Sequence, residues 1–194
     1  MRSMIITLGM MALAACGTSP PTRFFMLDPV GVDVQSRPQI SAPIEVDAVH
    51  IPPALDRQSM VRGESDHELK ISSQERWGAD FGEMARRVLT QDLQDRLAPG
   101  MVIPPHFPAP ANARGVVVNI LSFDPAASGR LVLDADWTLL EGSPAKPMLL
   151  RTARLSAPVG ESAASQAAAM SRLLGQLADE IVSGISQVDS VRAR

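Results

Sequence analysis

Residues 130–140 read Arg-Leu-Val-Leu-Asp-Ala-Asp-Trp-Thr-Leu-Leu, and this stretch decides the fold class. Its apolar residues, Trp137 among them, fall on every second position, and Asp134 and Asp136 lie between them. Because successive side chains of a β-strand point to opposite faces, this period of two predicts a strand with one buried and one wet face. Trp137 is therefore predicted to lie in the core.

Further strands are predicted on both sides of this stretch. Residues 115–123 contain the run Val-Val-Val-Asn-Ile-Leu-Ser-Phe, which is apolar enough for a central strand. Residues 148–157 follow as a third strand, with Pro144 and Pro147 in the intervening turn. Short connections of this kind favour antiparallel neighbours.

Two long helices are predicted from a different period. Apolar residues recur at helical spacing over residues 77–98 and again over residues 162–188. Asp80 with Glu83 three residues later is a capping-box candidate for the first helix, and Ser72 with Glu75 is a weaker one. Pro99-Gly100 is expected to end that helix. Trp77 is predicted to be a core anchor at its start.

The remaining segments are shorter, and the last four residues, Val-Arg-Ala-Arg, are expected to fray. The expected pieces are a strand at 24–27, an irregular stretch at 30–43, a strand at 44–49, a hairpin formed by 59–62 and 68–72, a short strand at 101–103 and a proline-rich loop at 104–113. Together they predict an α+β fold in a single domain over residues 24–194, with a mainly antiparallel sheet packed against two long helices.

The N-terminus has the layout of a secretory signal. Arg2 precedes an apolar run that ends in Leu-Ala-Ala-Cys at Cys16. We predict a lipoprotein signal peptide at 1–15, an acylated cysteine with a tether at 16–23, and lipidation of Cys16 as the membrane anchor. The alternatives are an ordinary signal peptide and a buried N-terminal helix. Cys16 is the single cysteine of the chain, so it has no disulfide partner within it.

Composition and motifs exclude several functions. A net charge of −3 gives no sign of nucleic-acid binding. The sequence has no GxxxxGK[ST] phosphate loop, no GxSxG elbow and no HExxH zinc motif. His67, beside Asp66 and Glu68, is read as a polar turn in preference to a metal site. Asp134 and Asp136 share a strand face, where a wet sheet surface is the better interpretation than acid–base chemistry. We therefore predict no catalytic residue, no metal and no cofactor.

Several short motifs, in order, resemble one known family. They include Ile44-Glu45-Val46, then Val49 to Pro53, Leu55-Asp56-Arg57, Met60-Val61-Arg62 and Arg76-Trp77. The second half adds Phe123-Asp124 and the Leu-x-Ala-x-Trp pattern that ends at Trp137. These motifs follow the Leu-Ala-Ala-Cys sequence, which resembles the lipobox of bacterial lipoproteins. Their order resembles that in the ABC-type transport auxiliary lipoprotein family, whose members include PqiC (YmbA)-like proteins. The resemblance covers most of the chain after the tether.

The resemblance implies a non-enzymatic role in lipid traffic across the envelope of Gram-negative bacteria. The implied partners are an MCE-domain protein and its ABC transporter, or PqiA-like membrane subunits. The protein is expected to contact the membrane through its acyl chains. Phospholipid and further copies of this chain are additional candidate partners. Gly17, where an aspartate would favour the inner membrane, implies outer-membrane residence with the domain in the periplasm.

Two loops are the candidate partner-binding segments. The first contains Leu55, Asp56 and Arg57, for which a plain turn is the competing interpretation. The second is the proline-rich segment from Pro104 to Pro110. The leading hypothesis is a lipoprotein that docks the MCE assembly at the outer membrane. The alternative is a structural lipoprotein that maintains the envelope without contacting lipid.

Overall fold

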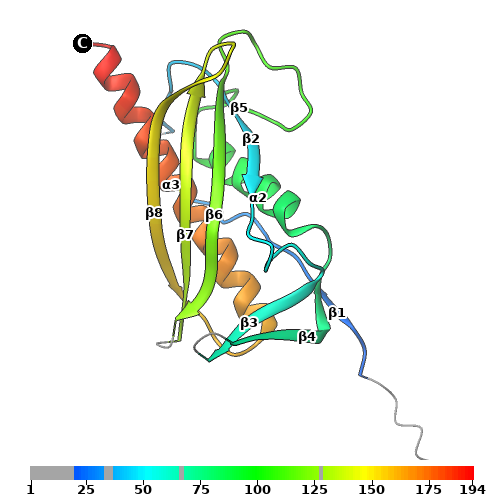
Figure 1. The fold of residues 1–194 in the computed structure, drawn as a ribbon. Coiled ribbons are helices and arrows are strands. Elements are labelled where there is room, and N and C mark those ends of the chain that lie inside the picture. Colours follow the sequence, from blue (N-terminus) through cyan, green and yellow to red (C-terminus); the bar gives the residue numbers. More distant parts are fainter. Residues whose placement is uncertain (1–19, 33–36, 66–67, 127–128) are drawn as a thin grey trace, which may run out of the picture.

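The computed structural model describes residues 20–32, 37–65, 68–126 and 129–194 and folds them into two sheets and two long helices. Both helices pack against one face of the larger sheet (Figure 1). The elements are β1 (Arg23–Phe25), β2 (Ile44–His50), β3 (Ser59–Ser65), β4 (Glu68–Trp77), α2 (Phe81–Arg96), β5 (Val102–Ile103), β6 (Arg114–Ala126), β7 (Arg130–Glu141), β8 (Lys146–Pro158) and α3 (Ala163–Arg192).

The larger sheet has the strand order β5-β2-β6-β7-β8. Strands β6, β7 and β8 form a long antiparallel meander, as residues 115–157 predict. Strand β2 instead pairs in parallel with both β5 and β6. Because a parallel pair needs a crossover connection, the chain between β2 and β6 is long and includes α2.

A smaller sheet of order β1-β4-β3 lies at the end of the molecule where the chain enters (Figure 1). Strands β3 and β4 are the predicted hairpin, and β1 joins β4 in parallel at Phe25 and Trp77. Strand β4 is irregular in its middle, where the Ser72 hydroxyl accepts hydrogen bonds from the Gln74 and Glu75 amides. The Ser72–Glu75 pair thus stabilises a distorted strand and caps no helix.

The core lies between the larger sheet and the two helices. Trp137 and Trp77 are both buried, as predicted. Trp77 is, however, the last residue of β4 and does not begin the helix, which starts at Phe81, and the two rings lie 5.1 Å apart. Helix α3 approaches the sheet closely at Gly184, where an added Cβ would sit 2.5 Å from a ring carbon of Trp137. Glycine is needed there because this close approach leaves no room for a side chain.

The helix ends follow local capping chemistry. The Asp80 carboxylate accepts a hydrogen bond from the Glu83 amide at 3.0 Å, so the predicted cap of α2 is confirmed. Gly100, with φ of +83°, turns the chain shortly after that helix. The last helix is longer than predicted: α3 extends to Arg192, whose guanidinium forms two 2.8 Å hydrogen bonds with Glu141, and only Ala193 and Arg194 lie beyond it.

The α+β class and the two long helices are therefore confirmed, with antiparallel pairing in the longest ladders. What the sequence did not predict is the division of the strands into two sheets and the parallel pairs at their edges. The predicted signal peptide at 1–15, Cys16 and the first part of the tether lie outside the described residues.

Candidate docking surfaces

The chain enters the described domain at one end of an elongated body. Pro20 is the first described residue, and β1 begins at Arg23 in the smaller sheet. Helix α3 begins near this end, and its last turn lies at the opposite end beside the turn between β7 and β8 (Figure 1). With 30 residues at a rise of about 1.5 Å each, α3 separates the two ends by about 45 Å.

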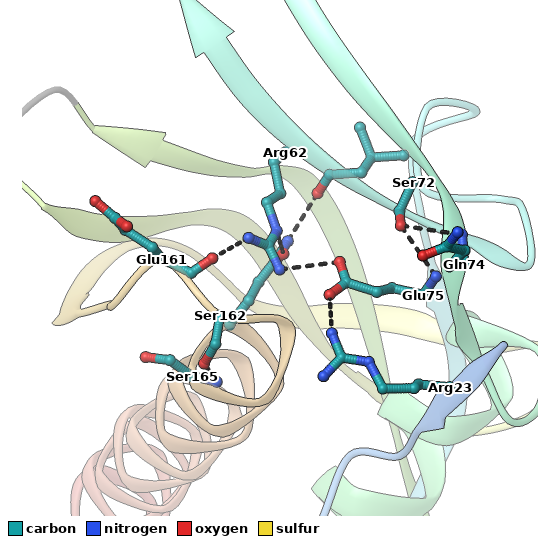
Figure 2. A network of polar contacts seen from close by, with 10 residues as sticks. Arg23, Arg62, Ser72, Gln74, Glu75, Glu161, Ser162 and Ser165 are labelled. Carbon is teal, nitrogen blue, oxygen red and sulfur yellow. Dashed lines mark hydrogen bonds and ion pairs between the residues drawn. The ribbon is translucent and has the colours of Figure 1, made fainter. Parts of the chain in front are cut away.

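A polar network ties β1 to the rest of the domain. Figure 2 shows Arg62 between the carboxylate of Glu75 and the residues that begin α3. Its guanidinium contacts Glu75 at 3.1 Å and Gln166 at 3.2 Å and donates to the Glu161 carbonyl. Glu75 also accepts a 2.5 Å hydrogen bond from Arg23. The three strands of the smaller sheet are thus connected to the start of α3, close to where the chain enters the domain.

The segment after β1 is held between the two helices. Leu27 is fully buried, and its carbonyl accepts a hydrogen bond from Arg87 of α2 at 3.0 Å. The Asp28 amide donates to the Ser171 hydroxyl of α3 at 3.1 Å, and the Val30 amide donates to a carboxylate of α2. Residues on opposite helices therefore fix the backbone that follows the tether.

Asp92 is the carboxylate that receives the Val30 amide, at 2.7 Å, and it is completely buried. Its Oδ1 lies 3.6 Å from Arg96, which pairs in turn with Asp179 at 2.6 Å. Oδ2 has no hydrogen-bond partner among the described residues. Burial raises the pKa of Asp92 to about 6, although the Val30 hydrogen bond and the Arg96 charge act to lower it.

Replacing Asp92 with asparagine should change how stability depends on pH. Because its pKa is raised from 3.8 to about 6 in the folded state, the protonated carboxyl stabilises the fold below about pH 4, and this contribution is lost as the pH rises through 6. Two pKa units correspond to roughly 3 kcal/mol. Urea unfolding should find Asp92→Asn equal to the native protein near pH 4 and more stable by roughly 2–3 kcal/mol at pH 7.5. A higher free energy of unfolding for the native protein than for Asp92→Asn at pH 7.5 would contradict the raised pKa of Asp92.

The loop of Leu55, Asp56 and Arg57 lies between β2 and β3. Leu55 is buried in the core, and its amide bonds to the Pro52 carbonyl at 2.9 Å, so it anchors the loop from below. Asp56 and Arg57 are exposed, and neither side chain has an ion pair with a described residue. The two charged groups thus remain available to a partner, although the structure contains none.

The proline-rich segment is also on the surface. Phe107 is exposed, and His106 before it has a positive φ of 67°. Pro105 and His106 border a groove of about 350 Å³ that also involves Met26 and the first turns of α2. This loop therefore lies close to the segment that follows β1.

A groove of about 830 Å³, here called the far groove, lies at the end opposite the point where the chain enters the domain. It is bordered by the turn between β7 and β8 and by the last turns of α3, with Met148, Val188 and Val191 as apolar lining. Lys146 and Arg151 add positive charge. A second groove, of about 470 Å³, lies between the segment after β1 and the start of α3.

Among the described residues, the His, Cys, Asp and Glu side chains form no group of three that fits a metal ion. Asp136 accepts a hydrogen bond from Thr152, and Asp134 lies 3.5 Å from Arg154, so the two carboxylates belong to the wet face of the sheet. His67 lies outside the described residues. No helix in the described ranges is both long and apolar enough to cross a bilayer.

The sequence pattern described as "ABC-type transport auxiliary lipoprotein component" matches residues 25–182. The chain belongs to this family. The predicted resemblance is confirmed over the domain from β1 into the second half of α3. No curated protein is detectably similar in sequence.

Two crystal structures show that other chains share the fold. One, of an uncharacterised protein, has 18% sequence identity and a TM-score of 0.70, and the alignment covers 86% of this chain and 99% of the other. The second, of protein XCC0632 from Xanthomonas campestris, has 17% identity and a TM-score of 0.68, with coverage of 87% and 99%. At these identities the likeness shows the fold alone.

Membership makes this chain an auxiliary lipoprotein component of an ABC-type transport system. Among the predicted site residues, the structure places Asp56 and Arg57 on one exposed loop and Leu55 beneath it. Sequence reasoning missed Asp92 and Arg96. A signal was present, because Asp92 follows Val88 by four positions and so lies on the apolar stripe of α2, four residues before an arginine.

Proposed function

We propose that this auxiliary lipoprotein is anchored to the outer membrane through acylated Cys16 and docks an MCE-domain assembly from the periplasmic side. The observation that carries the proposal is the entry of the chain at one end of the domain (Figure 1), with a groove of about 830 Å³ at the opposite end. A body held at one end presents its other surfaces to a partner that comes from the opposite membrane.

The short tether limits where the domain can act. Seven residues from Gly17 to Arg23 reach on the order of 20 Å at about 3.3 Å each. The domain adds about 45 Å along α3. The protein therefore works near its own membrane, and the transport assembly has to reach it.

We further propose that the protein acts by binding a protein partner and does not catalyse a reaction. The two candidate partner-binding segments are loops, and a loop can change its side chains without disturbing a sheet. Arg57 is the best placed of them, because a free guanidinium can form two hydrogen bonds with a partner carboxylate.

Substituting Arg57 with glutamate tests this docking role. Arg57→Glu should weaken co-purification with the MCE protein about tenfold or more, because a paired charge at an interface becomes a repelled one. Its free energy of unfolding should stay within about 0.5 kcal/mol of native, as for other exposed sites. Arg37→Glu makes the same charge change on another exposed segment and should bind normally.

Three outcomes are distinguishable in that experiment. Normal binding by a stable Arg57→Glu protein places the docking surface elsewhere on the domain. Unfolding of the variant shows that Arg57 has an internal role. If the native protein itself captures no MCE protein while its loss weakens the envelope, the structural alternative replaces the transport role.

A further inference from the structure

Two large apolar side chains stand exposed directly after the tether. Phe24 is 66% exposed and Met26 is 44% exposed, whereas Phe25 between them packs against the core. We call Phe24 and Met26, with the grooves beside them, the tether-side patch. Exposed apolar residues normally lie singly, so two of them flanking one strand residue point to a surface that is covered in use.

Met26 connects the two grooves of this patch. It borders the 470 Å³ groove, whose far wall is formed by Ala164, Ala167 and Ala168 of α3. It also borders the 350 Å³ groove, which includes Met84 of α2. The apolar surface therefore continues from the start of α3 across the chain entry toward α2.

Basic side chains exceed acidic ones around the patch. Arg76 lies beside Phe24 in the strand register, and Arg172 borders the groove against α3. The patch is surrounded by five arginines (Arg23, Arg76, Arg86, Arg87 and Arg172) and three carboxylates (Asp28, Glu75 and Glu83). An apolar centre with a basic rim is the chemistry that binds the interface of an anionic bilayer.

The position of the patch relative to the anchor identifies its occupant. Phe24 follows Cys16 by eight residues, so the patch stays within on the order of 25 Å of the acylated residue. The far groove, by contrast, lies at the other end of α3. A surface confined so closely to the anchor meets lipid continuously, whereas a partner from the other membrane meets the far end.

We propose that the tether-side patch contacts the bilayer that holds the acyl chains, with Phe24 and Met26 in the interface and the arginines at the headgroups. This inference rests on the proposed anchoring of Cys16. The contact orients the domain, because an anchor at one end of the chain does not by itself fix the direction in which the domain points. The long axis of α3 then points away from the membrane and presents the far groove to the periplasm.

Site-directed fluorescence in proteoliposomes tests the contact. In the acylated protein the Cys16 thiol is consumed by its thioether, so Phe24→Cys supplies one reactive thiol for an environment-sensitive dye. Val191→Cys, at a residue 74% exposed in the far groove, is the matched control. The vesicles contain phosphatidylethanolamine and phosphatidylglycerol, with a quencher attached to the upper part of the lipid chains.

The dye at position 24 should shift to the blue and lose roughly half of its emission to the lipid quencher, as a group seated in the interface does. The dye at position 191 should show neither change. Raising the salt concentration, or using phosphatidylcholine alone, should reduce the quenching at position 24, since the arginines then lose their anionic contacts.

Mass spectrometry of the same samples distinguishes failure of the proposed anchoring at Cys16 from failure of the proposed bilayer contact. If Cys16 carries no acyl chains, the proposed anchoring is wrong. If Cys16 is acylated and the dye at position 24 is not quenched, the bilayer contact is wrong. Equal quenching at positions 24 and 191 would show a domain without orientation, and a change at position 24 only on addition of the MCE protein would assign the patch to a protein partner.

Discussion

Replacing Arg114 with methionine should lower the free energy of unfolding by about 3 kcal/mol or more, because it leaves a largely buried carboxylate without its cation. Arg114 begins β6 and is 1% exposed. Its guanidinium contacts the two carboxylate oxygens of Asp189 at 2.8 and 3.3 Å and donates to the Ala42 carbonyl at 3.2 Å. The ion pair therefore holds the last turns of α3 against the larger sheet.

Asp189 depends on this cation. Burial raises the pKa of Asp189, but hydrogen bonds from Arg114 and from Ser41 outweigh that effect and hold the pKa below its ordinary value. The Ser41 amide and hydroxyl both lie 2.7 Å from the carboxylate. Loss of Arg114 thus also loosens the irregular segment before β2.

Thermal unfolding measures the effect. At about 2–4 °C per kcal/mol for a domain of this size, Arg114→Met should lower Tm by roughly 6–12 °C. The double variant Arg114→Met with Asp189→Asn removes both charges and should recover a large part of the loss. A Tm within about 2 °C of native in the single variant would mean that solvent replaces the arginine without cost.

Local sequence patterns predicted most of the secondary structure. The period of two over residues 130–140 corresponds to β7, and the helical stripes correspond to α2 and α3. These patterns work because each element buries one face, and that face is encoded in consecutive residues. The cap at Asp80 was predictable for the same reason, since donor and acceptor lie three positions apart.

Long-range pairing was not predictable from the same patterns. The parallel ladder between β2 and β6 joins residues about 70 positions apart, and the contact of Arg62 with Gln166 spans 104. No local period encodes such partners. The end of α3 illustrates the point, because Arg192 stays helical beside Glu141, a residue that belongs to β7.

The candidate sites also differ in whether a local sequence pattern or a long-range contact defines them. The predicted lipidation of Cys16 rests on a local motif, Leu-Ala-Ala-Cys, so sequence alone carries that prediction. The candidate docking loop could be assessed only from the structure, which buries Leu55 and leaves Asp56 and Arg57 exposed. The tether-side patch also needed it, because β1 in isolation does not reveal which of Phe24 and Phe25 faces the core.

Substituting Cys16 with serine should abolish lipid attachment completely. A serine hydroxyl is a far weaker nucleophile than a thiolate at neutral pH, so diacylglycerol is not transferred and cleavage before residue 16 does not follow. The intact protein should then have the mass of the full precursor. Native protein should have the mass of a chain that begins at an acylated Cys16.

The membrane consequence is equally large. Each buried methylene contributes about 0.8 kcal/mol, so one acyl chain binds reversibly and two or more anchor the protein stably. On a density gradient the native protein should therefore sediment with the outer membrane. The Cys16→Ser precursor should leave those fractions, because it has lost the acyl chains and the tether-side patch alone supplies only weak contact.

A control substitution in the tether tests whether the effects of Cys16→Ser are due to loss of the thiol. Thr18→Ala alters the tether two residues later and retains both Cys16 and Gly17. It should be processed and sorted like the native protein. Cleaved, outer-membrane protein from Cys16→Ser would show that an ordinary signal peptidase processes the chain. In that case the proposed position of β1 beside the membrane, and the orientation proposed for α3, would both lose the lipid anchor on which they rest.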